Sequence, residues 1–281
     1  KPSDELLDDL KYMQQATNLG SLIITQSEIS EIESSLKSIR NTIQTTNDIF
    51  LKLELNQLQQ ALEALTLLAN KYHCVVDNPP YMGGGNMNKP LADFVKANYP
   101  ASKSDLMACF MEAGLNSLHP KGFLGMINQH SWMFTSRYQD FRKKLIKKSS
   151  ICSLLHLGSR TFPEIGGEVV QSVSFILSNS STILEGAYIN LTNCNSSSKK
   201  ANELLRINVS VKSKYYIFNK EDFSKIPACR LGYWLNEKNL NVFKNEKVNR
   251  VAIPQTGLQT NDNTRFLRGW EEVDLNNISF K

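Results

Sequence analysis

The chain has 281 residues, of which 41% are hydrophobic and 21% are charged, and its formal net charge is +5. This is the composition of a soluble globular protein that can form one large domain or one domain and part of another. No apolar run is long enough for a membrane span, there is no signal-peptide pattern, and the five scattered cysteines suggest neither a disulfide framework nor a zinc site. We therefore expect a cytoplasmic protein with no membrane association and no bound metal. The basic charge permits nucleic acid binding but does not argue for it.

The first 70 residues predict helices. A short helix is expected from Asp4, with Ser3 as its N-cap. Residues 27–70 contain no Gly or Pro, and apolar residues recur there every three or four positions. The phase slips after residues 45–48 (Thr-Thr-Asn-Asp), which favour N-caps over helix interiors. A hairpin of two helices explains this more simply than one unbroken helix, and its apolar stripe fits either core packing or a partner-binding coiled coil.

An apolar segment at residues 72–77 stops at Asn-Pro-Pro-Tyr, residues 78–81. Two successive prolines can neither donate to a sheet ladder nor continue into a helix, so a strand must end here. The side-chain oxygen of Asn78 and the carbonyl of Pro79 can each accept one N–H of an exocyclic amine. Tyr81 can stack on the ring that carries the amine. The motif therefore predicts a site for a planar amine, with an ordinary Pro-Pro loop as the alternative.

Strands and helices alternate after this motif. The predicted elements are a helix that begins near residue 103 with Ser104 as its cap, a strand at 123–127, a basic helix at 136–147, and strands at 151–157 and 173–177. This order is typical of a parallel α/β sheet, in which sites gather at the carboxyl ends of strands, where both Asn78 and Asn128 fall. A further strand at 182–191 is expected to close the sheet with an antiparallel edge, before a polar linker at 193–200.

The pattern weakens after residue 200. Residues 251–270 mix turn formers, amides, two arginines and two aromatic residues. This mixture fits a loop that contacts nucleic acid, and it fits a turn between domains equally well.

Four segments in this order resemble the adenine-specific DNA methyltransferases of phage-exclusion (BREX, PglX-like) and type IIG restriction-modification systems. They are residues 75–82, 103–106, 122–127 and 257–268. The resemblance implies an α/β fold with part of a Rossmann-like methyltransferase sheet, mostly parallel with an antiparallel edge. It implies three parts: a helical segment at 1–70, the catalytic half of the methyltransferase domain at 71–200, and a connector with the start of a target-recognition region at 201–281.

The resemblance also assigns roles to residues. The reaction it implies is methyl transfer from S-adenosylmethionine to N6 of an adenine flipped out of double-stranded DNA. The catalytic residues would be Asn78, Pro79, Pro80 and Tyr81, and of these Asn78 and Pro80 would also contact the cofactor. Tyr81 and Phe162 would stack on the two faces of the base. The candidates for DNA contact are Arg137, Arg142, Lys143, Arg265 and Arg268, and other phage-defence or restriction subunits are further partners that the resemblance implies.

Two features depart from the family pattern. No glycine-rich turn between a strand and a helix precedes Asn78, although relatives use such a turn to hold the cofactor. Asn261 also stands where relatives have Gly, and Asn tolerates the left-handed backbone that such a turn requires. The sequence lacks an initiator Met, so we expect a fragment that carries the catalytic second half of such an enzyme and is inactive in isolation.

Two alternatives remain open at this point. Methyltransferases that modify a glutamine amide (N5) in proteins use the same Asn-Pro-Pro-Tyr chemistry, although they generally end soon after the sheet. The chain could also be a non-catalytic module that binds DNA or a partner protein.

Overall fold

The computed structural model describes residues 2–162, 170–207, 214–250 and 252. The chain divides into two compact units, residues 1–240 and residues 241–281. The elements below belong to the first unit, except that α10 (Glu237–Val242) crosses the boundary and η6 (Val248–Arg250) lies in the second. The predicted boundaries near residues 70 and 200 stay predictions.

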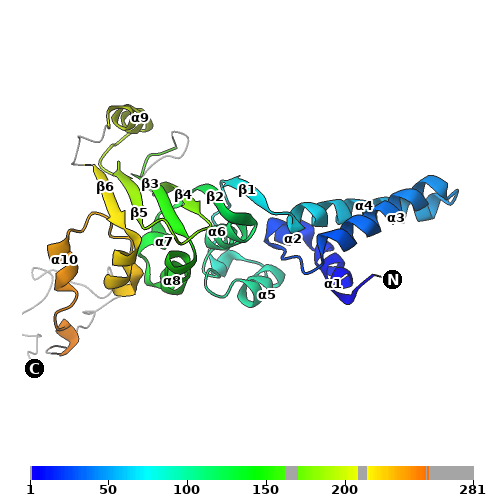
Figure 1. Cartoon of the computed structure of the whole chain (residues 1–281), viewed down its shortest axis with the longest axis horizontal. Helices are drawn as coiled ribbons and strands as arrows, with labels where there is room; N and C mark the ends of the chain where they lie inside the picture. Colours follow the sequence, from blue (N-terminus) through cyan, green and yellow to red (C-terminus); the bar gives the residue numbers. More distant parts are fainter. Residues whose placement is uncertain (1, 163–169, 208–213, 251, 253–281) are drawn as a thin grey trace, which may run out of the picture. The chain divides into compact units, whose positions relative to one another are not determined.

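Helices account for most of the first 70 residues (Figure 1). They are α1 (Asp4–Met13), α2 (Ala16–Leu19), the 3-10 turn η1 (Gly20–Leu22), α3 (Ile29–Thr45) and α4 (Ile49–Ala69). Ser3 caps α1, as predicted, by accepting from the Leu6 N–H. The α3–α4 hairpin confirms the prediction of two helices, and Asp48 caps the second helix by accepting from Phe50 and Leu51. Their apolar stripes form a small core with α1 through Leu6, Ile32, Leu36, Leu62 and Leu65.

The described residues form one six-stranded sheet in the order β1-β2-β4-β3-β5-β6 (Figure 1). Its strands are β1 (Tyr72–Asp77), β2 (Leu118–Gln129), β3 (Ser150–Gly158), β4 (Ser172–Ser178), β5 (Glu185–Asn190) and β6 (Tyr215–Asn219). The pairs β1–β2 and β3–β5 are parallel, whereas β4 is antiparallel to both its neighbours and β6 is antiparallel to β5. Four strands therefore share one direction, and the predicted α/β sheet with an antiparallel edge is confirmed.

Two details of the sheet differ from the prediction. The strand expected at 182–191 is β5, which runs parallel to β3, and the antiparallel edge is β6. The second antiparallel strand, β4, lies inside the sheet. Its register with β3 pairs Ser150 with Ser178 and Gly158 with Ser172, so β4 returns beside β3 in the opposite direction.

Helices and 3-10 turns complete the described structure. They are η2 (Gly84–Asn86), α5 (Lys89–Asn98), α6 (Leu106–Asn116), α7 (Ser131–Phe134), η3 (Ser136–Tyr138), α8 (Gln139–Lys148), α9 (Ser197–Arg206), η4 (Lys220–Lys225) and η5 (Pro227–Cys229). The start of α9 lies inside the segment predicted as a linker, with Ser196 as its N-cap. The main core joins the sheet to α6 and α8 through buried residues such as Met107, Leu124, Trp132, Phe141 and Phe175. None of the helices described is both long and apolar enough to cross a membrane.

Candidate active site

The Asn-Pro-Pro-Tyr tetrapeptide lies at the carboxyl edge of the sheet. β1 ends at Asp77, which is opposite Met126 of β2 in a parallel pair. Beyond that point Asn78 and Pro80 are exposed, Pro79 is buried and Tyr81 is half-buried. The Tyr81 hydroxyl donates to the Ile127 carbonyl at 3.4 Å, so the ring stays close to β2. The structure therefore places the predicted amine acceptors and stacking ring together.

The buried carboxylate of Asp105 fixes the loop that follows the tetrapeptide. Its Oδ1 accepts from the Met82 N–H at 3.2 Å and from the Met107 N–H at 3.1 Å. The Leu106 N–H donates to the Met82 carbonyl at 3.0 Å, and the Gly84 N–H donates to the Ser104 carbonyl at 3.1 Å. The start of α6 thus holds the loop next to Tyr81. Sequence reasoning placed the helix cap at Ser104, because Ser and Asp are both good N-caps, and it missed Asp105.

Asp77, the last residue of β1, is the acidic group nearest to the tetrapeptide along the chain. Burial raises the pKa of its carboxyl above the usual range, and the N–H of Asn78 opposes this shift. Asp77 also lines a cavity of about 360 Å³ alongside β1, together with apolar residues that include Val75, Val76 and Phe110. The outer edge of β1 has no strand partner among the described residues.

Phe162 and Asn128 reach the same edge of the sheet by different routes. β1, β2 and β3 run in the same direction, so their carboxyl ends lie on one side. Phe162 is half-buried and follows the end of β3 by four residues. Its contact with a base stays a prediction. Asn128 is fully buried in β2, so it cannot present its amide at the surface as Asn78 does.

The basic helix corrects one prediction. Arg142 is fully buried, and its guanidinium donates five hydrogen bonds of 2.7 to 3.2 Å to the backbone carbonyls of Trp132, Thr135, Ala228 and Cys229. Burial, and then the charge of Arg230, lower the pKa of this guanidinium to about 10, so it remains charged at neutral pH. A guanidinium that is fully buried and bonded to four backbone carbonyls is not accessible to a phosphate, so Arg142 is not a DNA contact.

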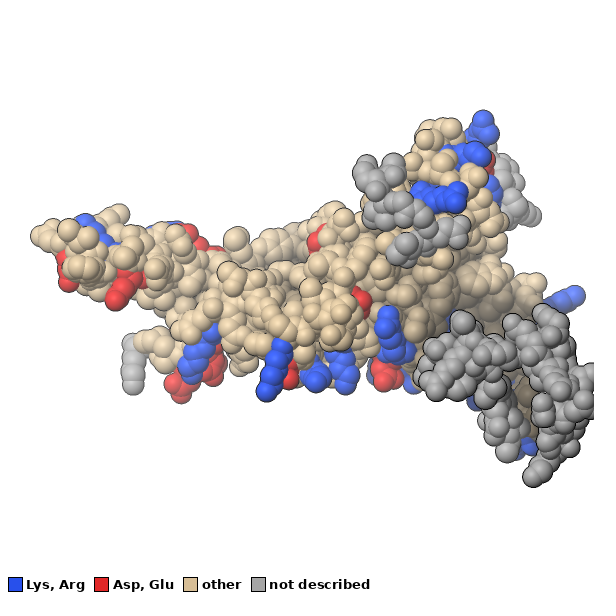
Figure 2. Space-filling view, turned by 180° about the vertical axis from the view of Figure 1, so that it is seen from behind, with Lys and Arg blue, Asp and Glu red and all other residues tan. Residues whose placement is uncertain are grey.

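Of the other predicted DNA contacts, two are exposed and two lie outside the described residues. Arg137 and Lys143 are exposed, with the Arg137 guanidinium 5.0 Å from the centroid of the Tyr138 ring and Lys143 Nζ 4.0 Å from Asp140 Oδ1. On the face drawn in Figure 2, lysines and arginines are interspersed with acidic side chains instead of merging into one basic surface. Arg265 and Arg268 lie outside the described residues.

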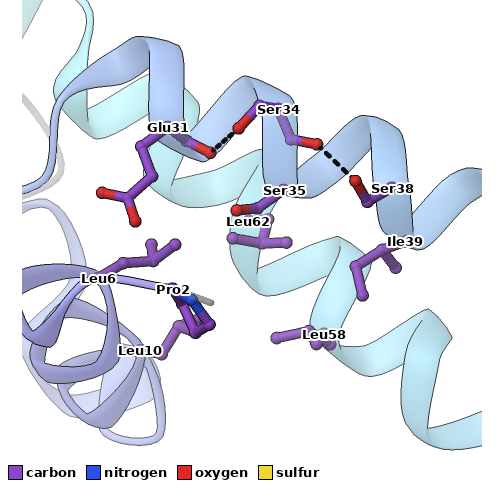
Figure 3. A pocket seen from close by; sticks show the side chains of 10 residues that line it. All are labelled: Pro2, Leu6, Leu10, Glu31, Ser34, Ser35, Ser38, Ile39, Leu58 and Leu62. Carbon is purple, nitrogen blue, oxygen red and sulfur yellow. Dashed lines mark hydrogen bonds between the residues drawn. The ribbon is translucent and has the colours of Figure 1, made fainter.

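A second cavity, of about 410 Å³, lies between α1 and the α3–α4 hairpin (Figure 3). Leucines, isoleucine, proline and serines line it, together with Glu31. The Glu31 carboxylate already accepts from the N–H and the hydroxyl of Ser3 at 2.7 and 2.8 Å, which lowers its pKa. We assign no reaction to this cavity. The described residues also contain no group of three or more His, Cys, Asp or Glu that could hold a metal ion.

Comparison with known proteins agrees with this geometry. The model of the Eco57I restriction-modification methylase family matches residues 10–162. The chain is 34% identical over 288 residues to the adenine-specific methyltransferase PglX of Lacticaseibacillus casei (strain Zhang), which covers 99% of this chain and 24% of the relative. It is also 34% identical over 277 residues to the adenine-specific methyltransferase BrxX of Escherichia coli O9:H4 (strain HS), covering 97% of this chain and 22% of that protein.

The chain thus spans about a quarter of the length of these curated relatives. A solved structure, a modification subunit of a putative type I restriction enzyme from Vibrio vulnificus YJ016, is 14% identical with a TM-score of 0.46. The match covers 69% of this chain and 47% of the chain in that structure, and this similarity is too distant to support an argument. The family match, by contrast, extends over more than half of the chain and includes the whole tetrapeptide. The predicted resemblance is therefore confirmed, and this chain belongs to the Eco57I restriction-modification methylase family.

Proposed function

We propose that this chain supplies the adenine-binding, catalytic part of a DNA adenine-N6 methyltransferase in a phage-defence or restriction-modification system. The observation that carries the proposal is the tetrapeptide at the carboxyl edge of the sheet, with Asn78 exposed and its loop held by Asp105. Two curated relatives that align with nearly the whole chain are adenine-specific methyltransferases. S-adenosylmethionine is the methyl donor that this assignment requires.

The tetrapeptide would act on the amine of a flipped adenine. The lone pair of that amine is delocalised into the ring, which makes the nitrogen a poor nucleophile. The Asn78 side-chain oxygen and the Pro79 carbonyl would each accept one of its N–H groups and draw electron density back to the nitrogen. Tyr81, with its hydroxyl on the Ile127 carbonyl, would hold one face of the base, and we assign the other face to Phe162.

The described residues supply only one wall of a donor site. Asn78 and Pro80 are exposed where β1 ends, and these are the two residues we assign to the methyl donor. The three glycines at 83–85 follow the tetrapeptide, whereas no glycine-rich turn between a strand and a helix precedes it among the described residues, and no other described strand ends in an acidic residue. The donor would supply an electrophilic methyl group, and we derive no step through it from these residues.

Contact with double-stranded DNA would draw on exposed basic groups. We assign phosphate contacts to Arg137 and Lys143, which are exposed on η3 and α8, and to Arg265 and Arg268 outside the described residues. Other subunits of the defence or restriction system are further partners in this proposal. We assign the protein to the cytoplasm, where its five free cysteines would stay reduced.

Asn78→Ala in the complete translation product that contains these residues tests the proposal. We expect transfer of labelled methyl groups to DNA to fall by about a hundredfold or more, because a preorganised polar contact to the reacting group is lost. Asn116→Ala, at an exposed asparagine of α6, should keep the activity. Normal methylation of DNA by Asn78→Ala, or methyl transfer to protein glutamine instead of DNA, would contradict the proposal.

A further inference from the structure

Three side chains form a chain of hydrogen bonds at the carboxyl edge of the sheet, and the assignments above do not use them. His130 Nδ1 lies 2.8 Å from His156 Nε2, and His156 Nδ1 lies 3.0 Å from the Tyr233 hydroxyl. His130 directly follows β2, His156 belongs to β3, and Tyr233 comes from the segment after η5. His156 and Tyr233 are buried, whereas His130 is half-buried. We call these three residues the histidine chain.

The tyrosine end of the histidine chain fixes where the protons lie. The Tyr233 hydroxyl has His156 Nδ1 as its hydrogen-bond partner, and we assign the hydroxyl proton to this bond, since a tyrosine hydroxyl is usually bonded when it is buried. His156 then carries its proton on Nε2 and donates it to His130 Nδ1. His130 in turn carries its proton on Nε2, on the other side of the ring. The histidine chain therefore ends in an N–H donor.

Both histidines are neutral at physiological pH. Burial lowers the pKa of His130, and burial together with the neighbouring His130 lowers the pKa of His156 to about 4. The groups that face the histidine chain are aromatic: Phe134 beside the histidines, and Tyr188, Tyr216 and Trp234 beside Tyr233. No carboxylate or cation of the described residues contributes to either pKa shift. The donor at His130 is thus an uncharged one.

Strand order places the end of β2, which His130 follows, beside the end of β1, which leads into the tetrapeptide. β2 lies beside β1, which leads into Asn78, and on its other side it pairs with β4, which joins it to β3. Asn128 of β2, Val173 of β4 and His156 of β3 form one row across the sheet. His130 lies just beyond that row. It therefore follows the strand between Asn78 on one side and the segment that carries Phe162 on the other.

We propose that the Nε2–H of His130 donates a hydrogen bond to a ring nitrogen of the target adenine, so that His130 helps to select this base. This inference rests on the proposed function. Adenine carries its amine between two ring acceptors, N1 and N7, and the tetrapeptide provides acceptors for the amine. Guanine has an oxygen in place of the amine and a hydrogen on N1. The two acceptors at Asn78 and Pro79 therefore match the adenine amine and oppose the guanine oxygen. The donor at His130 opposes guanine as well when the nitrogen that it meets is N1, whereas N7 is an acceptor in both bases.

His156 and Tyr233 act as positioning residues in this assignment. They fix the tautomer of His130, as second partners of a histidine commonly do. Tyr233→Phe removes the hydroxyl proton that begins the histidine chain but keeps the buried ring. In that variant the tautomer of His130 is no longer set, so selection of adenine should weaken even though no group that contacts the base has changed.

Base analogues with the complete translation product provide the test. Methyl transfer and DNA binding are measured with adenine, 1-deazaadenine or 7-deazaadenine at the target position. The wild type should lose about tenfold in kcat/KM with the analogue that lacks the bonded nitrogen. His130→Ala should lose about tenfold with adenine and nothing further with that analogue, while His130→Gln, which keeps an N–H donor, should still discriminate. His73→Gln, at an exposed histidine of β1, should behave as the wild type.

The outcomes separate this inference from the function on which it rests. The role of His130 would be overturned if the loss in kcat/KM caused by His130→Ala and the loss caused by each deaza base were additive. It would also be overturned if the wild type were insensitive to both analogues. A wild type that does not methylate DNA would overturn the proposed function itself. Nitrogen-15 NMR of the histidine rings gives a readout without activity: the wild type should show His130 protonated on Nε2 and Tyr233→Phe a mixture, whereas Nδ1 protonation in the wild type would contradict the assignment.

Discussion

The carboxyl end of β1 and helix α8 hold their polar side chains in opposite ways. At the end of β1, Asn78 is exposed, and its loop is fixed through backbone groups that bond to Asp105. In α8, the guanidinium of Arg142 makes five hydrogen bonds to four carbonyls, and the side chain is fully buried. We expect a polar side chain that binds a ligand to keep donors or acceptors free for that ligand, whereas a side chain that stabilises the fold forms its hydrogen bonds within the protein.

Arg142 also connects the segment that follows β2, through the carbonyls of Trp132 and Thr135, to the turn that precedes Tyr233. It bonds to the carbonyls of Ala228 and Cys229, whose φ values of 60° and 51° lie in the left-handed region that non-glycine residues rarely adopt. This turn costs backbone energy, and the guanidinium offsets the cost. The chain then runs directly to Tyr233, the buried end of the histidine chain. A residue with no contact to the substrate can therefore affect the site through the turn it stabilises.

Arg142→Met should give the largest effect on stability. It leaves four carbonyls without their donor and frees the strained turn, so we expect a loss of about 3 to 5 kcal/mol in the free energy of unfolding. Urea unfolding followed by circular dichroism measures it. Arg137→Met, at an exposed arginine nearby, should change the stability by less than about 0.5 kcal/mol. Similar losses in the two variants would remove the distinction between a structural and an exposed arginine.

Local signals explain why the tetrapeptide could be predicted. The β-branched pair Val75 and Val76, followed by two prolines, specifies a strand that ends at one residue, whatever the rest of the chain does. The α3–α4 hairpin was predictable for the same reason, since the cap at Asp48 and the apolar period lie within one segment. In both cases the information that decides the structure is contiguous in the sequence.

Contacts between distant segments explain what could not be predicted. The carbonyls that bind Arg142 include two that lie 86 and 87 residues away, so the basic run at 136–148 resembles a DNA-binding surface in the sequence. His130 and His156 are 26 residues apart and meet only because β4 places their strands two positions apart. Asp105 and Ser104 are equally good caps by residue type. Only the backbone of the tetrapeptide loop decides between them.

Asp105→Ala should have an intermediate effect on stability. It shows whether the loop after the tetrapeptide needs its hydrogen bond to Asp105. The variant loses the cap of α6 and the bond to the Met82 N–H, so we expect a loss of about 1 to 2 kcal/mol in the free energy of unfolding. Methyl transfer by the complete translation product should fall as well, because Tyr81 is then less well held. Ser104→Ala is the matched control and should leave both quantities nearly unchanged. If Ser104→Ala were the more harmful change, the cap assignment from the structure would be wrong.

The smallest effect on stability, and a distinct effect on DNA binding, is expected for Arg137→Ala and Lys143→Ala. Both side chains are exposed, so unfolding should shift by less than about 0.5 kcal/mol. If each contacts one phosphate, the slope of log K against log salt concentration for duplex DNA should become shallower by about 0.9 per substitution. Lys37→Ala, at an exposed lysine of the helical hairpin, should leave the slope unchanged. Equal slopes in all three variants would mean that α8 and the segment before it serve the fold alone, and that DNA is held by other parts of the protein.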